Sequence, residues 1–310
     1  MNMEAPKKGI RIVLAKIFIA TGERRLRSGW RLGLHLLLLG SLLFLLTALF
    51  SAGLSLLPER WRSSTLLLAG SQAILILAFT LSVVIARHFF DRRSFASLGL
   101  QWNKHTLGDL LVGFSIPGLM MGAIYLIEWG AGWLSFEGYA WQFEPLSEVM
   151  IEFFIMLGVF VVVSWQEELL SRGYWFQNLS EGLNPVWGVA ISSILFALLH
   201  LVNPHMSVSA GLGLFAAGIF LAYARVRSGQ LWLAMGLHTG WNFFEGTVFG
   251  FSVSGLENLS PLIVQSVAGP ELFTGGAFGP EAGLVLLPAL LVGAVLVYGY
   301  TKNRTRNELV

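Results

Sequence analysis

Long apolar stretches separated by short polar segments dominate this chain. A helix needs about 20 predominantly apolar residues to cross a bilayer. Eight stretches come near or exceed that length, at about 32–56, 64–87, 107–130, 148–179, 185–202, 207–226, 230–250 and 281–300. The pattern predicts an all-α fold, a polytopic membrane helical bundle with about eight transmembrane helices.

The segments outside these stretches differ in character. Residues 7–31 are basic, with apolar positions interleaved with Arg11 and Lys16, which is typical of an interfacial helix on an anionic membrane surface. A cleaved signal peptide fits less well, because the apolar run that follows is too long for its hydrophobic region. We therefore divide the chain into a basic amphipathic N-terminal segment, 1–31, and a single transmembrane domain, 32–310. The glycine-rich stretch 251–280 is interpreted as a long loop, with partial re-entry into the membrane as a further option.

Composition agrees with a membrane protein and excludes some chemistry. The chain is 55% hydrophobic and 12% charged, with a mean hydropathy of +0.68, whereas soluble domains carry about 25% charged residues. Cysteine is absent, which excludes disulfides and thiolate chemistry. Any metal site must therefore use His, Glu, Asp or Asn side chains.

Charge distribution predicts the orientation in the membrane. With eight spans both termini lie on one side, and most Lys and Arg residues then fall on that side. The loops 131–147 and 251–280 contain Glu but no Lys or Arg, and only Arg60 and Arg62 fall on the opposite side. Because cytoplasmic loops carry an excess of Lys and Arg, we expect an integral, multi-pass protein with both termini in the cytoplasm.

Three charged residues interrupt the fourth apolar stretch. Glu167 and Glu168 are adjacent, and Arg172 follows one helical turn later. A charge at the bilayer centre costs about 2.5–3.5 kcal/mol on insertion scales. We therefore expect these residues to be paired, to be hydrated or to take part in the function of the protein. Glu168 and Arg172 have the favourable acid-first i,i+4 spacing for an ion pair. Glu167 points about 100° away on the helix and remains the freer carboxylate, suited to act as a general base toward water.

Two more polar clusters lie in later apolar stretches, at Phe196 to His200 and at His238 to Asn242. At 1.5 Å per helical residue, Glu167 and His200 lie about 20 Å from the cytoplasmic face, His238 about 12 Å and Asn242 about 18 Å. Separate helices thus place polar residues at similar depth. This predicts a polar reaction chamber inside the bundle.

The residue types in this chamber favour hydrolysis. Glu167 would deprotonate a water molecule, while Asn242 and a histidine would donate hydrogen bonds to the oxyanion of a tetrahedral intermediate. Alternatively, His200 and His238 would hold a divalent metal such as zinc together with a glutamate. Neither His-Glu-x-x-His nor Gly-x-Ser-x-Gly occurs in the chain. The sequence therefore does not decide whether the histidines stabilise the oxyanion or bind a metal.

The three motifs together resemble a known family. Glu167-Glu168-x-x-x-Arg172, Phe196-x-x-x-His200 and His238-x-x-x-Asn242 resemble the CPBP family of intramembrane proteases, which comprises the CAAX prenyl endopeptidases and the bacteriocin-processing or Abi proteins. The resemblance implies a catalytic core at about 148–250 and an intramembrane endopeptidase acting on a membrane-associated or lipidated protein or peptide. It implies that Glu167 activates water, that His200 belongs to the active site, and that His238 and Asn242 bind a metal or stabilise the oxyanion. Glu168 and Arg172 would form an ion pair that supports these active-site residues.

The resemblance also sets the expected surroundings. The family's spread implies a bacterial inner or plasma membrane, with a membrane protein or peptide as substrate, no nucleic acid and no organic cofactor. A non-proteolytic membrane scaffold or immunity protein with the same fold is the alternative function. An ion-coupled transporter ranks lower, because no inverted repeat is apparent. The sequence does not name the substrate, the oligomeric state or the role of Glu245.

Structural roles account for several other polar and small residues. A single histidine in a span commonly makes a hydrogen bond between helices, and His35 is interpreted in this way. Phe196 is expected to pack against the chamber. Gly211, Gly213 and Gly218 are expected to allow close contact between helices.

Overall fold

A computed structural model describes residues 18–20, 25–59, 64–257 and 260–304. Most of the N-terminal segment 1–31 lies outside the described residues, as do Arg60 and Arg62, so the interfacial helix stays a prediction. The chain divides into two compact units, Met1–Leu98 with Tyr174–Gly188, and Gly99–Gly173 with Val189–Val310. Each unit is described by itself below, and the predicted domain boundaries stay predictions.

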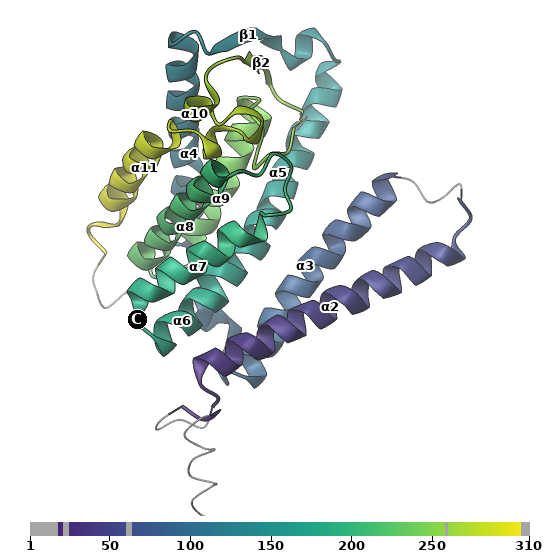
Figure 1. The fold of residues 1–310 in the computed structure, drawn as a ribbon, viewed down its shortest axis with the longest axis vertical. Helices are drawn as coiled ribbons and strands as arrows, with labels where there is room; N and C mark the ends of the chain where they lie inside the picture. Colours follow the sequence, from purple (N-terminus) through teal and green to yellow (C-terminus); the bar gives the residue numbers. More distant parts are fainter. Residues whose placement is uncertain (1–17, 21–24, 60–63, 258–259, 305–310) are drawn as a thin grey trace, which may run out of the picture. The chain divides into compact units, whose positions relative to one another are not determined.

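Helices make up most of the described chain (Figure 1). The longer helices are α2 (Ser28–Leu56), α3 (Ser64–Phe89), α4 (Thr106–Gly130), α5 (Leu146–Glu168) and α8 (Val208–Ser228). The shorter helices are α6 (Phe176–Gly182), α7 (Pro185–Leu199), α9 (Trp232–Asn242), α10 (Glu271–Thr274) and α11 (Leu286–Thr301).

Among the described residues, five helical segments are long and apolar enough to cross a membrane. They are Ser28–Leu56, Ala69–Phe89, Thr106–Gly130, Leu146–Gly182 and Val208–Ser228. The shorter helices α7 and α11 are also apolar, and α9 lies in the remaining predicted stretch. Each of the eight predicted stretches therefore contains a helix, and the predicted all-α, polytopic membrane bundle is confirmed.

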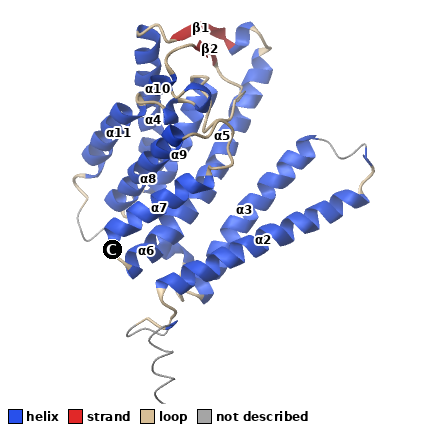
Figure 2. Cartoon of the chain, viewed as in Figure 1, coloured by secondary structure: helices blue, strands red, loops and turns tan. Residues whose placement is uncertain are grey.

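The loops 131–147 and 251–280, which contain no Lys or Arg, form a small sheet that the sequence pattern did not predict (Figure 2). Strand β1 (Leu134–Tyr139) pairs antiparallel with β2 (Ile263–Val267), with a register shift between Phe136 and Gly138. The interpretation of 251–280 as loop alone was therefore wrong. The pairing joins segments more than 100 residues apart, so its hydrogen bonds leave no local periodicity from which β2 could be recognised.

In the second unit, α9 packs against α4, α5 and α8. Glycines bring α4 and α9 into backbone contact. A Cβ atom added to Gly236 would lie 2.6 Å from the carbonyl oxygen of Leu110, and one added to Gly240 would lie 2.3 Å from that of Phe114. Small residues are what permits such close approach of membrane helices. The position of α9, which carries His238, therefore depends on these glycines.

The glycines singled out on α8 behave unequally. A Cβ atom on Gly213 would lie 1.7 Å from the Glu281 carbonyl oxygen, and one on Gly218 would lie 2.8 Å from the Ser193 Cβ. Gly211 has only an ordinary contact, at 3.4 Å from the Met206 Cε. Close packing thus explains Gly213 and Gly218 but not Gly211.

Replacing Gly240 with alanine should destabilise the fold, because the new methyl group collides with rigid backbone of α4 rather than with a flexible side chain. Overpacking of this kind costs about 1–3 kcal/mol. Gly158 of α5 is the matched control, because nothing lies within 4 Å of an added Cβ atom there and alanine favours a helix by about 1 kcal/mol over glycine. Thermal unfolding in detergent would test this, and a Gly240→Ala melting temperature equal to that of Gly158→Ala would contradict it.

In the first unit, α2 packs on α3 and on α6. His35 of α2 is fully buried. Its Nε2 atom lies 3.3 Å from the Ser82 hydroxyl, and its Nδ1 accepts a hydrogen bond from the Trp175 indole at 3.4 Å. The predicted role of His35 as a hydrogen-bonding residue between helices is thereby confirmed.

Candidate active site

The residues of the three motifs all lie in the second unit, on segments that end or bend near them. Glu167 and Glu168 are the last residues of α5, and His200 directly follows the end of α7. His238 and Asn242 lie on α9. Arg172 lies beyond α5, in the segment that continues it.

Both α5 and α9 widen into π-helices directly after their motif residues. The first π-helix is Leu169–Trp175 and the second is Phe243–Val248. A π-helical segment disrupts the regular i,i+4 ladder and occurs frequently at functional sites. The sequence carries no pattern from which we anticipated either transition.

Glu167 lies between the two histidines. Its Oε2 atom is 3.8 Å from the Nε2 of His200 and 3.8 Å from the Nε2 of His238. These separations exceed a direct hydrogen bond and are ones that a water molecule can bridge. Within the described part of the chain Oε2 has no hydrogen-bond partner, and the side chain remains 18% exposed. Three groups capable of proton transfer thus converge on one point.

Glu168 performs a different task from its neighbour. Its buried Oε1 atom accepts hydrogen bonds from Arg172 Nη1 at 2.7 Å and from His238 Nδ1 at 2.9 Å. An ionised carboxylate only accepts hydrogen bonds, so Nδ1 of His238 carries a proton and donates it. The Nε2 atom of His238 is consequently turned toward Glu167. Glu168 and Arg172 therefore orient His238.

His200 is oriented in the same way by backbone. Its Nδ1 atom lies 2.9 Å from the carbonyl oxygen of Phe196. Because a carbonyl oxygen only accepts, Nδ1 of His200 is also the protonated nitrogen. The spacing Phe196-x-x-x-His200 thus supplies the histidine with its own acceptor one helical turn away. Both histidines present Nε2 to Glu167.

Arg172 is fully buried and held on several sides. Its Nη2 atom donates to the carbonyl oxygen of Gly218 at 3.2 Å, and its guanidinium lies 4.2 Å from the centre of the Phe196 ring. Such a cation–π contact is strengthened when the cation is desolvated. Phe196 therefore supports the site through its ring and its carbonyl oxygen, which extends the packing role expected for it.

Asn242 lies on α9, one turn after His238, and is buried. No side-chain hydrogen bond joins it to Glu167, His200 or His238 in the described part of the chain, and its place on the same face as His238 follows from the helix spacing. Nearby, the hydroxyls of Ser164 and Thr239 lie 2.5 Å apart and link α5 to α9. The structure thus brings Glu167, His200 and His238 together, with Asn242 on the adjoining turn.

Two further carboxylates lie on or beside the same elements. Glu281 accepts hydrogen bonds from the Trp241 indole at 3.1 Å and from the Ser254 hydroxyl at 2.5 Å. We did not identify Glu281 from the sequence, where the only indication is an acidic residue at the edge of an apolar stretch. Glu245 is fully buried, and among the described residues neither of its carboxylate oxygens has a hydrogen-bond partner.

The side chains at the predicted metal site are of types that bind zinc, but their positions do not form a metal site. Two imidazole Nε2 atoms and a carboxylate oxygen are donors that zinc accepts. Among the residues that the structure describes, however, no group of three His, Asp or Glu side chains is placed so that it could hold a metal ion. Metal binding by His200 and His238 therefore stays a proposal.

Comparison with known proteins locates the same region. Residues 149–244 match the family model described as type II CAAX prenyl endopeptidase Rce1-like, and all seven motif residues fall within this stretch. The "Uncharacterized protein YyaK" of Bacillus subtilis (strain 168) is 25% identical over 239 residues, which cover 73% of each chain. No solved structure matches this chain. The predicted resemblance to this protease family is confirmed over residues 149–244, and the long apolar helices of the chain agree with an integral membrane protein.

Proposed function

We propose that this chain, with its Rce1-like core, is an intramembrane endopeptidase that hydrolyses a peptide bond in a membrane-associated or lipidated protein or peptide. The observation that carries the proposal is the convergence of Glu167 Oε2 with the Nε2 atoms of His200 and His238, at 3.8 Å from each. A bacterial inner or plasma membrane, with both termini in the cytoplasm, is part of the proposal and is supported by the distribution of Lys and Arg.

The first step uses Glu167 as a general base. A water molecule at the point of convergence donates a hydrogen bond to Oε2, and Glu167 takes its proton as the water oxygen attacks the carbonyl carbon of the substrate. A carbon–oxygen bond forms, and the electron pair of the carbonyl double bond moves to its oxygen. Glu167 suits this role because its carboxylate is not held in the ion pair that occupies Glu168.

The second step needs donors for the developing oxyanion. The Asn242 amide can donate one hydrogen bond, and a histidine Nε2 can donate another when its ring is protonated, because Nδ1 is already a donor. The intermediate then collapses, the carbon–nitrogen bond breaks, and the proton held by Glu167 passes to the leaving amine. The net change is the addition of one water molecule across the peptide bond.

The same histidines offer a second way to assist the reaction. When its ring is neutral, each Nε2 has a free electron pair and can bind a divalent metal such as zinc. A zinc ion bound there would polarise the substrate carbonyl and the attacking water. The hydrogen bond from His238 to Glu168 would orient the ring in either case, as carboxylates commonly do for metal-binding histidines.

A comparison of protein termini in cells would test whether the chain cleaves proteins. Cells would express the wild type, Glu167→Ala or Glu148→Ala at matched membrane levels. Glu148 is the control because it is an exposed glutamate in the first turn of the same helix, α5. We expect new protein ends with the wild type and with Glu148→Ala, and none of them with Glu167→Ala.

The same comparison bears on the alternative function. If no ends differ, and the Glu167→Ala protein still produces the cellular phenotype of the wild type, the chain acts without proteolysis, as a scaffold or immunity protein. Ends that depend on Glu167 would identify candidate substrates, whose lipidation can then be measured directly. The experiment therefore tests the activity and its substrate class together.

A further inference from the structure

A cluster of arginines surrounds a cavity in the first unit, where α2 begins. The cavity has a volume of about 1050 Å³. The charged residues that line it are Arg25, Arg27, Arg31, Arg93 and Glu181. We call it the arginine cavity. None of the three motifs contributes a residue to it.

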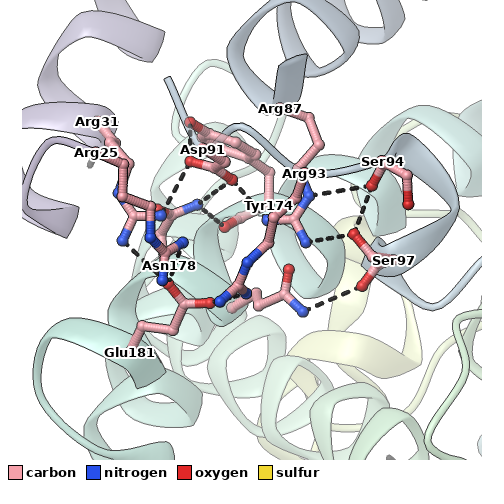
Figure 3. A network of polar contacts seen from close by, with 11 residues as sticks. Arg25, Arg31, Arg87, Asp91, Arg93, Ser94, Ser97, Tyr174, Asn178 and Glu181 are labelled. Atoms are coloured by element: carbon pink, nitrogen blue, oxygen red, sulfur yellow. Dashed lines mark hydrogen bonds and ion pairs between the residues drawn. The ribbon is translucent and has the colours of Figure 1, made fainter. Parts of the chain in front are cut away.

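Arg31 of the cavity lining pairs with the buried carboxylate of Asp91 (Figure 3). Asp91 accepts hydrogen bonds from Arg31 Nη1 at 3.0 Å and from Arg87 Nη1 at 2.6 Å. The hydroxyl of Tyr174 and the side-chain amide of Asn178 also contact it, at 3.3 and 3.4 Å. The charge of Asp91 is therefore already shared by two arginines within the protein.

A second carboxylate, that of Glu181, pairs with three arginines of the lining. Glu181 of α6 pairs with Arg31 Nη2 at 3.0 Å, with Arg25 Nη1 at 3.1 Å and with the guanidinium of Arg93. Three guanidinium groups thus share one carboxylate. Its side chain is 23% exposed and lines the cavity.

The network is left with excess positive charge. Among the described residues, and leaving Arg25 aside, Arg31, Arg87 and Arg93 contribute three positive charges, whereas Asp91 and Glu181 contribute two negative charges, which leaves a balance of +1. The exposed Arg27 on the lining raises this balance to +2. Like charges held this close repel one another where water is scarce, and a bound anion would offset the repulsion.

The residue types and the position of the cavity identify the class of anion. Guanidinium groups bind phosphate oxygens through paired hydrogen bonds, for which arginine is better shaped than lysine. The candidate span Ser28–Leu56 begins at the cavity, so the cavity lies at the level of lipid headgroups. Trp30, on the same lining, is 45% exposed and is of the residue type enriched at membrane interfaces.

We propose that the arginine cavity binds the phosphate group of an anionic phospholipid. Basic pockets between membrane helices on the cytoplasmic side are known to take up such headgroups, and the distribution of Lys and Arg places the start of α2 on that side. The proposal does not depend on proteolysis, because none of the proposed catalytic residues lines the cavity.

Native mass spectrometry of the full chain released from detergent would test lipid binding. The probes are phosphatidylglycerol, the zwitterionic phosphatidylcholine, and inorganic phosphate. Arg27→Gln, Arg93→Gln and the double variant remove positive charge at exposed positions on the lining. Arg92→Gln is the matched control, because Arg92 is an exposed neighbour that does not line the cavity.

We expect the wild type and Arg92→Gln to retain phosphatidylglycerol in preference to phosphatidylcholine. The apparent affinity for phosphatidylglycerol should fall about fivefold for each arginine removed and about 25-fold in the double variant. This follows because one basic residue near an anionic surface usually contributes about 1 kcal/mol to binding. The melting temperature of each variant, measured in detergent, checks that the fold is retained.

Three results would overturn the proposal. Equal retention of phosphatidylglycerol by the wild type and the double variant would show that the arginines do not hold the lipid. Equal retention of both lipids by the wild type would show that the site does not select an anionic headgroup. Binding of inorganic phosphate with the same arginine dependence, but no retention of phosphatidylglycerol, would assign the cavity to a free anion instead.

Discussion

Replacing Glu167 with glutamine should lower the kcat/KM of peptide-bond hydrolysis by about 10²- to 10⁴-fold, the usual contribution of a general base. Glutamine has nearly the same size as glutamate but cannot take up a proton from water under these conditions. The Glu168–Arg172 ion pair and its hydrogen bond to His238 do not involve Glu167. The substitution should therefore remove the base and leave its surroundings in place.

The measurement would use purified protein in proteoliposomes and a peptide that spans a cleavage point identified in cells. Glu148→Gln is the control for loss of an acidic residue from α5, since Glu148 is exposed and lies at the opposite end of that helix. Melting temperatures would show whether both variants remain folded. A folded Glu167→Gln variant with the wild-type rate would rule out Glu167 as the base.

Replacing either His200 or His238 with alanine should lower kcat by about 10²- to 10³-fold, as expected for loss of one group that stabilises a developing oxyanion. Each ring has its Nδ1 atom engaged, by the Phe196 carbonyl oxygen or by Glu168, and its Nε2 atom turned toward Glu167. The two variants should therefore have effects of similar size. KM should change less than kcat, because the lost interaction forms chiefly in the transition state.

His205→Ala is the control for these two variants. His205 is an exposed histidine whose Nε2 lies 3.8 Å from Glu257, and its replacement should leave the rate unchanged because it belongs to none of the three motifs. Wild-type rates in both folded variants at His200 and His238 would show that neither ring takes part in the reaction.

Metal content, measured on the same proteins purified without chelators, would separate the two possible roles of the Nε2 atoms. If they bind a metal, the wild type should contain about one equivalent, the number expected for a single zinc site. Both His200→Ala and His238→Ala should then lose it, and a chelator should abolish hydrolysis. If they act as donors to the oxyanion, hydrolysis should persist in the presence of the chelator, and the metal content should not follow the substitutions.

Much of this protein follows from local sequence pattern. The eight apolar stretches predicted the helices because a bilayer requires backbone hydrogen bonds to be satisfied within each spanning segment. Glu167, Glu168 and Arg172 stood out because charges are costly at that depth. The spacing of Glu168 and Arg172 predicted their pairing because i,i+4 residues share a helix face.

Other features depended on contacts between distant segments. The sequence allowed Glu245 several roles, and the structure places it where neither carboxylate oxygen finds a hydrogen-bond partner among the described residues. Glu281 was not recognised, because its partners Trp241 and Ser254 lie 40 and 27 residues away. The pairing of β1 with β2 escaped notice for the same reason.

The sequence by itself determined which apolar segments are helical and which polar residues interrupt them, because each of these follows from the pattern within one segment. Only the tertiary structure decided that Glu167 faces both histidines, which ring nitrogen each histidine presents, and that arginines from separate segments surround one cavity. These outcomes depend on how helices pack side by side, and backbone contacts such as that between Gly240 and Phe114 set that packing. Such contacts join residues far apart in the chain, so no local pattern encodes them.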